Sequence, residues 1–206
     1  MRSKLFIVLT LLVAAAWVNP AAAQAPQIQR QSIRGTVAKL DGQTLTVKSR
    51  DGATIAVALA PHYVVRSLVR KKLSDIHPGD FVGTTSMPGK DGKLHAVEIH
   101  FFPANLKLRE IQEPWDLAPG AMMTNAHVAG VAKAAHGSVL SINYNNRVTE
   151  VIVDRKTAIV APSPTPASAA DLKPGRAVFI LATKGADGTP TAVNITVEKN
   201  GVKPPM

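Results

Sequence analysis

One stretch of this sequence occurs twice. Leu73-Ser74-Asp75-Ile76-His77-Pro78-Gly79-Asp80 returns as Ala169-Ala170-Asp171-Leu172-Lys173-Pro174-Gly175-Arg176, 96 positions further along (Pro78 to Pro174). Both copies carry an acidic residue, an aliphatic residue and a Pro-Gly pair at matching places. Pro cannot continue a helix and Gly permits a reversal, so each copy predicts a short helical turn that ends in a tight turn.

The similarity extends on both sides of this stretch. Downstream, Ala96-Val97-Glu98-Ile99 returns as Ala192-Val193-Asn194-Ile195, again 96 positions later. Upstream, Val37-Ala38-Lys39 returns as Val131-Ala132-Lys133, 94 positions later. A repeat of this length indicates a duplicated small domain rather than a solenoid unit.

Apolar residues with a period of two surround the repeated stretch and predict β-strands with one buried face. The Asp-Gly pairs at 41–42 and 51–52 favour tight hairpin turns. A different spacing over 68–76 predicts a short helix or 3₁₀ turn, and its counterpart in the second copy includes a Pro-rich loop at 161–166. Strands are expected at 33–40, 44–49, 53–59, 81–87 and 94–102 in the first repeat, and at 128–134, 139–144, 148–153, 176–182 and 191–197 in the second.

Three strands, a short helix and two further strands follow the order of an OB-like barrel. We therefore expect an all-β fold of two tandem five-stranded OB-like barrels, each with a short helix or turn between strands 3 and 4. One barrel is assigned to each repeat. The expected boundaries are a flexible arm at 24–31, the first barrel at 32–103, a connector at 104–124, the second barrel at 125–198 and a disordered tail at 199–206.

The N-terminal segment 1–23 has the pattern of a signal peptide. Arg2 and Lys4 precede an apolar run at 5–18, which is too short to span a bilayer as a helix. Small residues at 21–23 then predict cleavage after Ala23, and an uncleaved anchor is the alternative. We expect an exported, soluble protein of the periplasm with no transmembrane segment after cleavage.

Composition narrows the chemistry. The chain has no cysteine, so disulfides, thiol catalysis and Cys-ligated zinc are excluded. The sequence contains none of the common catalytic motifs: no Gly-x-Ser-x-Gly elbow, no His-Glu-x-x-His pair and no phosphate-binding glycine loop. We therefore expect a protein that is not an enzyme and that needs no cofactor.

The charge balance favours an anionic partner. The 206 residues include 24 Lys and Arg against 14 Asp and Glu, a formal net charge of +10. Only 4% of residues are aromatic, which disfavours single-stranded nucleic acid as a ligand because such sites stack bases on rings. The densest basic cluster is Arg66, Arg70, Lys71 and Lys72. It predicts an anion-binding loop, and a solvated loop is the alternative.

Trp115 lies in the connector between the repeats. A tryptophan in a long connector usually fixes the connector to a neighbouring domain. The functional alternative is an aromatic platform that faces a ligand, and on that interpretation Trp115 joins the candidate binding residues.

A metal site is the alternative chemistry. Glu98 and His100 are two residues apart, so we place them together on the exposed face of a strand, with His95 nearby. The second repeat has Asn194 and Thr196 at the places of Glu98 and His100. A metal site would therefore belong to the first repeat alone.

Several motifs together resemble a known group of proteins. They are residues 33–37, 45–47 and 73–79, Pro114-Trp115-Asp116-Leu117 and residues 123–126. With them, the chain resembles exported alphaproteobacterial proteins with OB-like domains of unknown function, whose look-alikes are often labelled metal ABC transporter permease. The resemblance implies an envelope location and a β-barrel fold, and it brings no catalytic or ligand residues. The permease label conflicts with the sequence, because a permease needs several membrane spans.

These observations predict a non-enzymatic periplasmic binding or scaffolding protein built from a duplicated β-barrel module. Its expected partner is an envelope protein or an anionic envelope component, and not nucleic acid. The alternative is a periplasmic accessory metal-binding protein associated with metal transport. The sequence leaves the oligomeric state open.

Overall fold

A computed structural model describes residues 29–103, 106, 108–134, 137–185 and 187–204. The predicted signal peptide and residues 24–28 of the predicted arm lie outside these ranges. Within them, no helix has the length and apolar character needed to cross a membrane.

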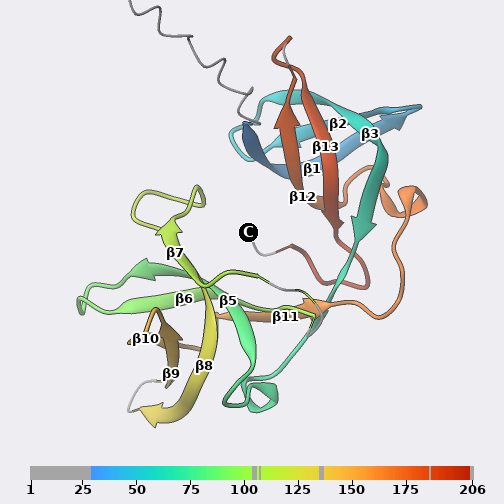
Figure 1. Cartoon of the computed structure of the whole chain (residues 1–206). Coiled ribbons are helices and arrows are strands. Elements are labelled where there is room, and N and C mark those ends of the chain that lie inside the picture. The colour runs from blue at the N-terminus through green and yellow to red at the C-terminus, as the bar shows by residue number, and fades with distance from the viewer. Residues whose placement is uncertain (1–28, 104–105, 107, 135–136, 186, 205–206) are drawn as a thin grey trace, which may run out of the picture.

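The described chain is built from strands joined by short turns (Figure 1). Two 3₁₀ turns, η1 (Leu73–Asp75) and η2 (Ala169–Asp171), lie where the repeated Asp and Pro-Gly residues predicted them. The strands are β1 (Arg30–Asp41), β2 (Thr44–Ser49), β3 (Thr54–Arg66), β4 (Leu68–Arg70), β5 (Phe81–Pro88), β6 (Leu94–Phe101), β7 (Ile111–Pro114), β8 (Met122–Ala134), β9 (Gly137–Tyr144), β10 (Arg147–Val153), β11 (Ala158–Pro162), β12 (Ala177–Lys184) and β13 (Pro190–Val197).

One barrel closes in the order β1-β12-β13-β3-β2. Strands β1, β2 and β3 come from the first repeat, and β12 and β13 come from the second. The β3–β13 pairing is parallel, whereas the other four pairings are antiparallel. We call this unit the split barrel, because two distant parts of the chain build it.

The other barrel closes through β8, β9, β10, β6 and β5, with a parallel pairing between β10 and β6. Here β5 and β6 come from the first repeat and β8–β10 from the second. All five strands lie in the continuous segment of the sequence from β5 to β10. This segment is inserted in the sequence between β3 and β12 of the split barrel. We call it the inserted barrel.

Two five-stranded barrels are therefore confirmed, but the assignment of one barrel to each repeat is wrong. Each repeat contributes its strands 1–3 to one barrel and its strands 4 and 5 to the other. The repeat pattern shows which strands are equivalent. It does not show which copy of strands 4 and 5 pairs with a given set of strands 1–3, because both copies have similar alternating faces. The choice between them is made by the path of the chain after strand 3.

That path is a pair of crossovers. From β3 the chain runs through β4 and η1 into β5, and from β10 it runs through β11 and η2 into β12. The two crossovers pair antiparallel, with Val160 opposite Arg70 and Pro162 opposite Leu68. Figure 1 shows this pair between the two barrels. Residues 68–70, predicted as the start of a helix, are thus extended, and only 73–75 form a helical turn.

Each barrel has its own apolar core, as alternation predicted. A third, small cluster joins Leu68 and Val160 of the crossovers to Val202 near the C-terminus. The split-barrel core includes Ile33, Val37, Leu45, Val47, Val57, Val178, Ile180, Ile195 and Val197. The inserted-barrel core includes Ile76, Val82, Ala96, Ile99, Ala126, Val128, Leu140, Ile142 and Val151.

Several boundaries differ from the expectation. Strand β1 begins at Arg30, so Arg30 and Gln31 are not part of a loose arm. The predicted connector contains β7, which pairs with β8 from Met122 onward. Val37 pairs with Val47 immediately before a β-bulge, and Val128 pairs with Ile142 immediately before a bulge in the same place of the second repeat. Val37 therefore corresponds to Val128 and not to Val131.

Candidate functional site

A hollow of about 300 Å³ lies beside the crossover pair. Arg70 of β4, residues 158–160 of β11 and residues 201–203 of the C-terminal segment line it. The β4–β11 pairing holds the first two walls together, with Val160 opposite Arg70. Three segments that are remote in sequence thus meet at one place.

The C-terminal wall is a tight turn. Asn200 and Gly201 have φ angles of 51° and 73°, and Lys199 and Val202 exchange two backbone hydrogen bonds around them. Asn-Gly is the dipeptide that favours this left-handed turn. Val202 is only 9% exposed and packs with Leu68 and Val160. The predicted disordered tail is therefore wrong for residues 199–204, and residues 205–206 lie outside the described ranges.

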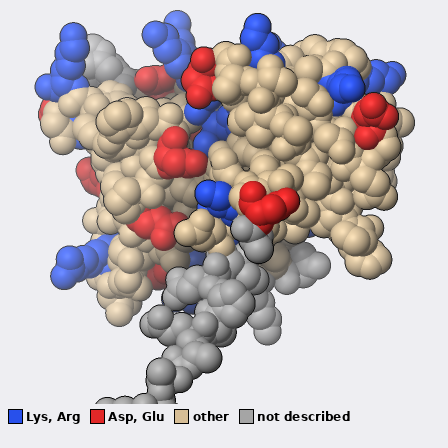
Figure 2. Space-filling view, turned by 90° about the horizontal axis from the view of Figure 1, so that it is seen from above, with Lys and Arg blue, Asp and Glu red and all other residues tan. Residues whose placement is uncertain are grey.

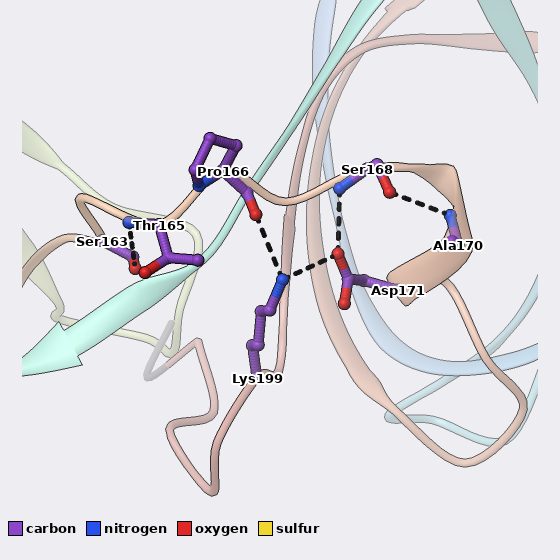
Figure 3. Close-up of polar contacts among 7 residues, drawn as sticks. All are labelled: Ser163, Thr165, Pro166, Ser168, Ala170, Asp171 and Lys199. Atoms are coloured by element: carbon purple, nitrogen blue, oxygen red, sulfur yellow. Dashed lines mark hydrogen bonds and ion pairs between the residues drawn. The ribbon is translucent and has the colours of Figure 1, made fainter.

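Lys199 fixes this turn to the second crossover, as Figure 3 shows. Its Nζ donates to the carbonyl of Pro166 at 3.1 Å and to Oδ2 of Asp171 at 3.0 Å. Asp171 also accepts from the backbone N–H of Ser168 at 3.0 Å. The Ser168 N–H and then Lys199 lower the pKa of Asp171. We call residues 199–203 the C-terminal clasp.

The charged groups at the hollow are both cationic. Among the described residues, neither Arg70 nor Lys203 forms an ion pair, whereas Arg34, Lys39 and Lys199 do. The other lining residues are mainly aliphatic: Ala158, Ile159, Val160 and Val202. Two unpaired cations beside an apolar wall are suited to hold an anion that carries a short apolar group.

The predicted basic cluster is only partly assembled. Arg66 ends β3 opposite Thr196, and its side chain is exposed. Lys71 and Lys72 are also exposed; the N–H of Lys71 bonds to Ile159, and that of Lys72 bonds to Asp75 of η1. Of the four predicted residues, Arg70 alone lines the hollow. Lys203 was missed because nothing periodic surrounds it, although Asn200-Gly201 was a local signal for an ordered turn.

Charge on the rest of the surface is dispersed. On the face that Figure 2 shows, Lys and Arg side chains are interspersed with Asp and Glu. This face therefore carries no large patch of one sign, and the net charge of +10 does not concentrate there. An anion would be attracted by local geometry rather than by a broad basic field on this face.

Trp115 lies elsewhere, on the side chain of Arg34 in β1. The guanidinium of Arg34 is 5.6 Å from the ring centre of Trp115 and 4.9 Å from that of Phe179. It also donates two hydrogen bonds to Asp116, at 3.0 and 2.7 Å. The loop after β7, which belongs to the side of the inserted barrel, is thereby fixed to the split barrel. These contacts favour the connector-fixing interpretation of Trp115 over the ligand platform.

Burial and Arg34 oppose each other at Asp116. Partial burial acts to raise the pKa of Asp116, but the hydrogen bonds and the charge of Arg34 outweigh it, so the pKa is lowered. The carboxylate therefore stays ionised and paired. Arg34 is only 8% exposed and Asp116 occupies its guanidinium, so this partly buried pair is a contact between the barrels and not a free anion site.

The three predicted metal ligands do not converge. Glu98 Oε1 is 3.2 Å from Nδ1 of His100, whereas His95 pairs with Asp91 at 3.1 Å. The prediction that Glu98 is exposed is wrong: it is 1% exposed. Nowhere in the described part of the chain do three His, Cys, Asp or Glu side chains gather as potential metal ligands.

A β-bulge in β6 changes which residues upstream of Glu98 face the core. Thr85 pairs with Glu98 and Ser86 pairs with Ala96, so Val97 is the extra residue. Ala96 and Ile99 both face the core as a result, and Val97 does not. Strict alternation from Ile99 would place Val97 on the core face, because an extra residue in one strand leaves no signature in the period.

Comparison with known proteins gives no relative. No protein-family model, no curated protein and no solved structure matches the chain. Any function must therefore be argued from the geometry of the chain itself.

Proposed function

We propose that this chain is a non-enzymatic binding and scaffolding protein of the periplasm, which holds an anionic component of the cell envelope at its crossover. The observation that carries this proposal is the hollow lined by Arg70 and Lys203, two cations without an ion-pair partner in the described structure. Charge-assisted bonds to an anion would satisfy both groups. The location in the periplasm rests on the predicted signal peptide.

The architecture supports a scaffold. Because the chain passes from one barrel to the other through two paired crossovers, the β4–β11 pairing forms a two-stranded link between the barrels. The Arg34–Asp116 pair adds a second contact between the two sides. A ligand at the crossover would therefore meet a preorganised site, which lowers the entropic cost of binding.

Cosedimentation with vesicles tests the proposal. We expect the purified protein to pellet with phosphatidylglycerol vesicles and not with phosphatidylcholine vesicles at the same salt concentration, and peptidoglycan sacculi provide a second anionic target. Arg70→Ala combined with Lys203→Ala should abolish the pelleting. Lys48→Ala is the matched control, because Lys48 is an exposed lysine on β2, far from the hollow. Equal loss in the control would point to bulk charge and contradict a site at the crossover.

A further inference from the structure

Resting on this proposed function, we infer that the hollow at the crossover is a phosphate site, and that its ligand is a phosphate group carried on a short aliphatic moiety. Glycerol phosphate has this chemistry, whether free or as part of a lipid headgroup. Arg70 and the C-terminal clasp hold the phosphate between them. The argument rests on the donors, the size and the apolar wall of the hollow.

The donors favour phosphate over carboxylate. Arg70 offers a planar fork of N–H groups, which matches two oxygens of one anion, and Lys203 offers a compact charge. The backbone N–H groups of Gly201 and Lys203 donate to no acceptor in the described part of the chain. Donors from two segments, β4 and the clasp, suit the tetrahedral oxygens of a phosphate, in a monoester or a diester, better than the planar pair of a carboxylate.

The size and the walls define what carries the phosphate. A volume of about 300 Å³ is at the lower end of ligand pockets. It admits a phosphate with a few carbon atoms, so that only the headgroup of a lipid would enter it. Ala158, Val160 and Val202 form the apolar side of the hollow. A short aliphatic group beside the phosphate would cover this side.

Binding would also tighten the clasp. Lys199 already anchors one end of the clasp to Pro166 and Asp171, and Val202 packs on Leu68 and Val160. Lys203, at the far end, has no such anchor among the described residues. A phosphate shared by Arg70 and Lys203 supplies that anchor, so the ligand should slow amide hydrogen exchange in the clasp.

Titration of the purified protein with four small anions tests the inference. The probes are glycerol 3-phosphate, inorganic phosphate, sulfate and glycerate, which carries a carboxylate on a similar skeleton. Binding is followed by calorimetry and, for the phosphates, by ³¹P NMR. We expect glycerol 3-phosphate to bind at least about tenfold more tightly than glycerate, and more tightly than inorganic phosphate.

The variants separate geometry from charge. Arg70→Lys keeps the charge and removes the planar fork, so it should weaken glycerol 3-phosphate by about five- to tenfold. Lys203→Ala should weaken it similarly and abolish the protection of the clasp from hydrogen exchange. Lys48→Ala should change neither result. An unchanged melting temperature of each variant without ligand shows that the fold is retained.

The outcomes distinguish this inference from the proposed function. If glycerate binds as tightly as glycerol 3-phosphate, or if only sulfate binds, the phosphate assignment is overturned while an anion-binding function stands. Equal affinity for inorganic phosphate and glycerol 3-phosphate overturns the role of the aliphatic group. If none of these anions binds and vesicles are not bound either, both the inference and the proposed function fail.

Discussion

Leu68 and Pro162 face each other in the β4–β11 pair, and they occupy equivalent places in the two repeats. They are 94 positions apart. Arg66 and Val160 are separated by the same offset, and each of these pairs with the end of a fifth strand: Arg66 with Thr196, and Val160 with His100. The pairing thus relates the first crossover to the second by an approximate two-fold axis. In agreement with this symmetry, each repeat places its strands 4 and 5 in the barrel that contains strands 1–3 of the other repeat.

Dissection of the chain should follow the barrels and not the repeats. A fragment of residues 72–162 contains every strand of the inserted barrel, so we expect it to fold alone with a cooperative thermal transition. A fragment of residues 29–103 lacks β12 and β13, the partners of β1 and β3. It should show no cooperative transition as a monomer. Circular dichroism and gel filtration of the two fragments check this, and a stable monomer from 29–103 would contradict the strand exchange.

Arg34→Ala should destabilise the protein by about 1–3 kcal/mol, because it removes two charge-assisted hydrogen bonds and leaves Asp116 without its partner. Lys39→Ala is the control, since the Lys39–Asp41 pair is exposed on both sides and should contribute less than about 1 kcal/mol. Urea unfolding measures both. Equal losses in the two variants would mean that the Trp115–Asp116 loop does not fix the barrels together.

Gly35→Ala should destabilise the split barrel. An added Cβ would overlap the carbonyl of Lys48 and lie 2.8 Å from Cγ1 of Val47, inside the β1–β2 pair. Overpacking of this kind costs about 1–3 kcal/mol. Gly130→Ala is the matched control, because nothing lies within 4 Å of its added Cβ and its φ is not positive. Thermal melts that rank the two variants in the opposite order would refute the close approach at Gly35.

The C-terminal clasp should weaken in acid. The pKa of Asp171 is lowered in the folded state, so its carboxylate stabilises the protein above its ordinary pKa of about 4, and this contribution is lost as the pH falls through the lower, folded-state value. Asp171→Asn should therefore be less stable than the parent protein at pH 6–7, and the two stabilities should converge below about pH 4. Unfolding free energies from pH 3 to 7 test this; a gap that does not change with pH would exclude a charged link to Lys199.

Glu98→Gln should leave the unfolding free energy at pH 7 unchanged or raise it. Glu98 is 1% exposed, and its Oε2 has no hydrogen-bond partner in the described structure. Burial of a charged carboxylate is unfavourable, whereas an amide of the same shape avoids that cost. Urea unfolding with and without zinc is the measurement. A loss above about 2 kcal/mol would mean that the bond between Glu98 and His100 outweighs the cost of burial. Zinc stabilisation of the parent protein alone would instead support the metal-binding alternative.

Local patterns were sufficient to find most strands. The segment 44–49 was predicted and is β2, and the 3₁₀ turns fall on the repeated Asp and Pro-Gly residues. Period, turn dipeptides and helix breakers act over a few residues, so they can be read directly from the chain. The short strands β7 and β11 were not predicted, because they have no clear apolar period and form only by pairing with neighbouring strands.

The sequence indicated only one of the two cationic residues of the candidate site. Arg70 stood out in a basic cluster, yet Lys203 had to be brought to it by the clasp. Likewise, Trp115 was recognisable as an anchor, but its contact with Arg34 joins residues more than 80 positions apart. Such convergence depends on the complete path of the chain, which no local pattern encodes.

The duplication, the all-β class and the number of strands in each barrel follow from patterns in the amino-acid sequence. Which copies share a barrel depends on the path of the folded chain. Ala96-Val97-Glu98-Ile99 and Ala192-Val193-Asn194-Ile195 are both suitable fifth strands, and they present similar patterns to β3. The crossovers β4 and β11 follow strand 3 in each repeat and carry strands 4 and 5 to the opposite barrel, because the backbone of each crossover pairs with that of the other.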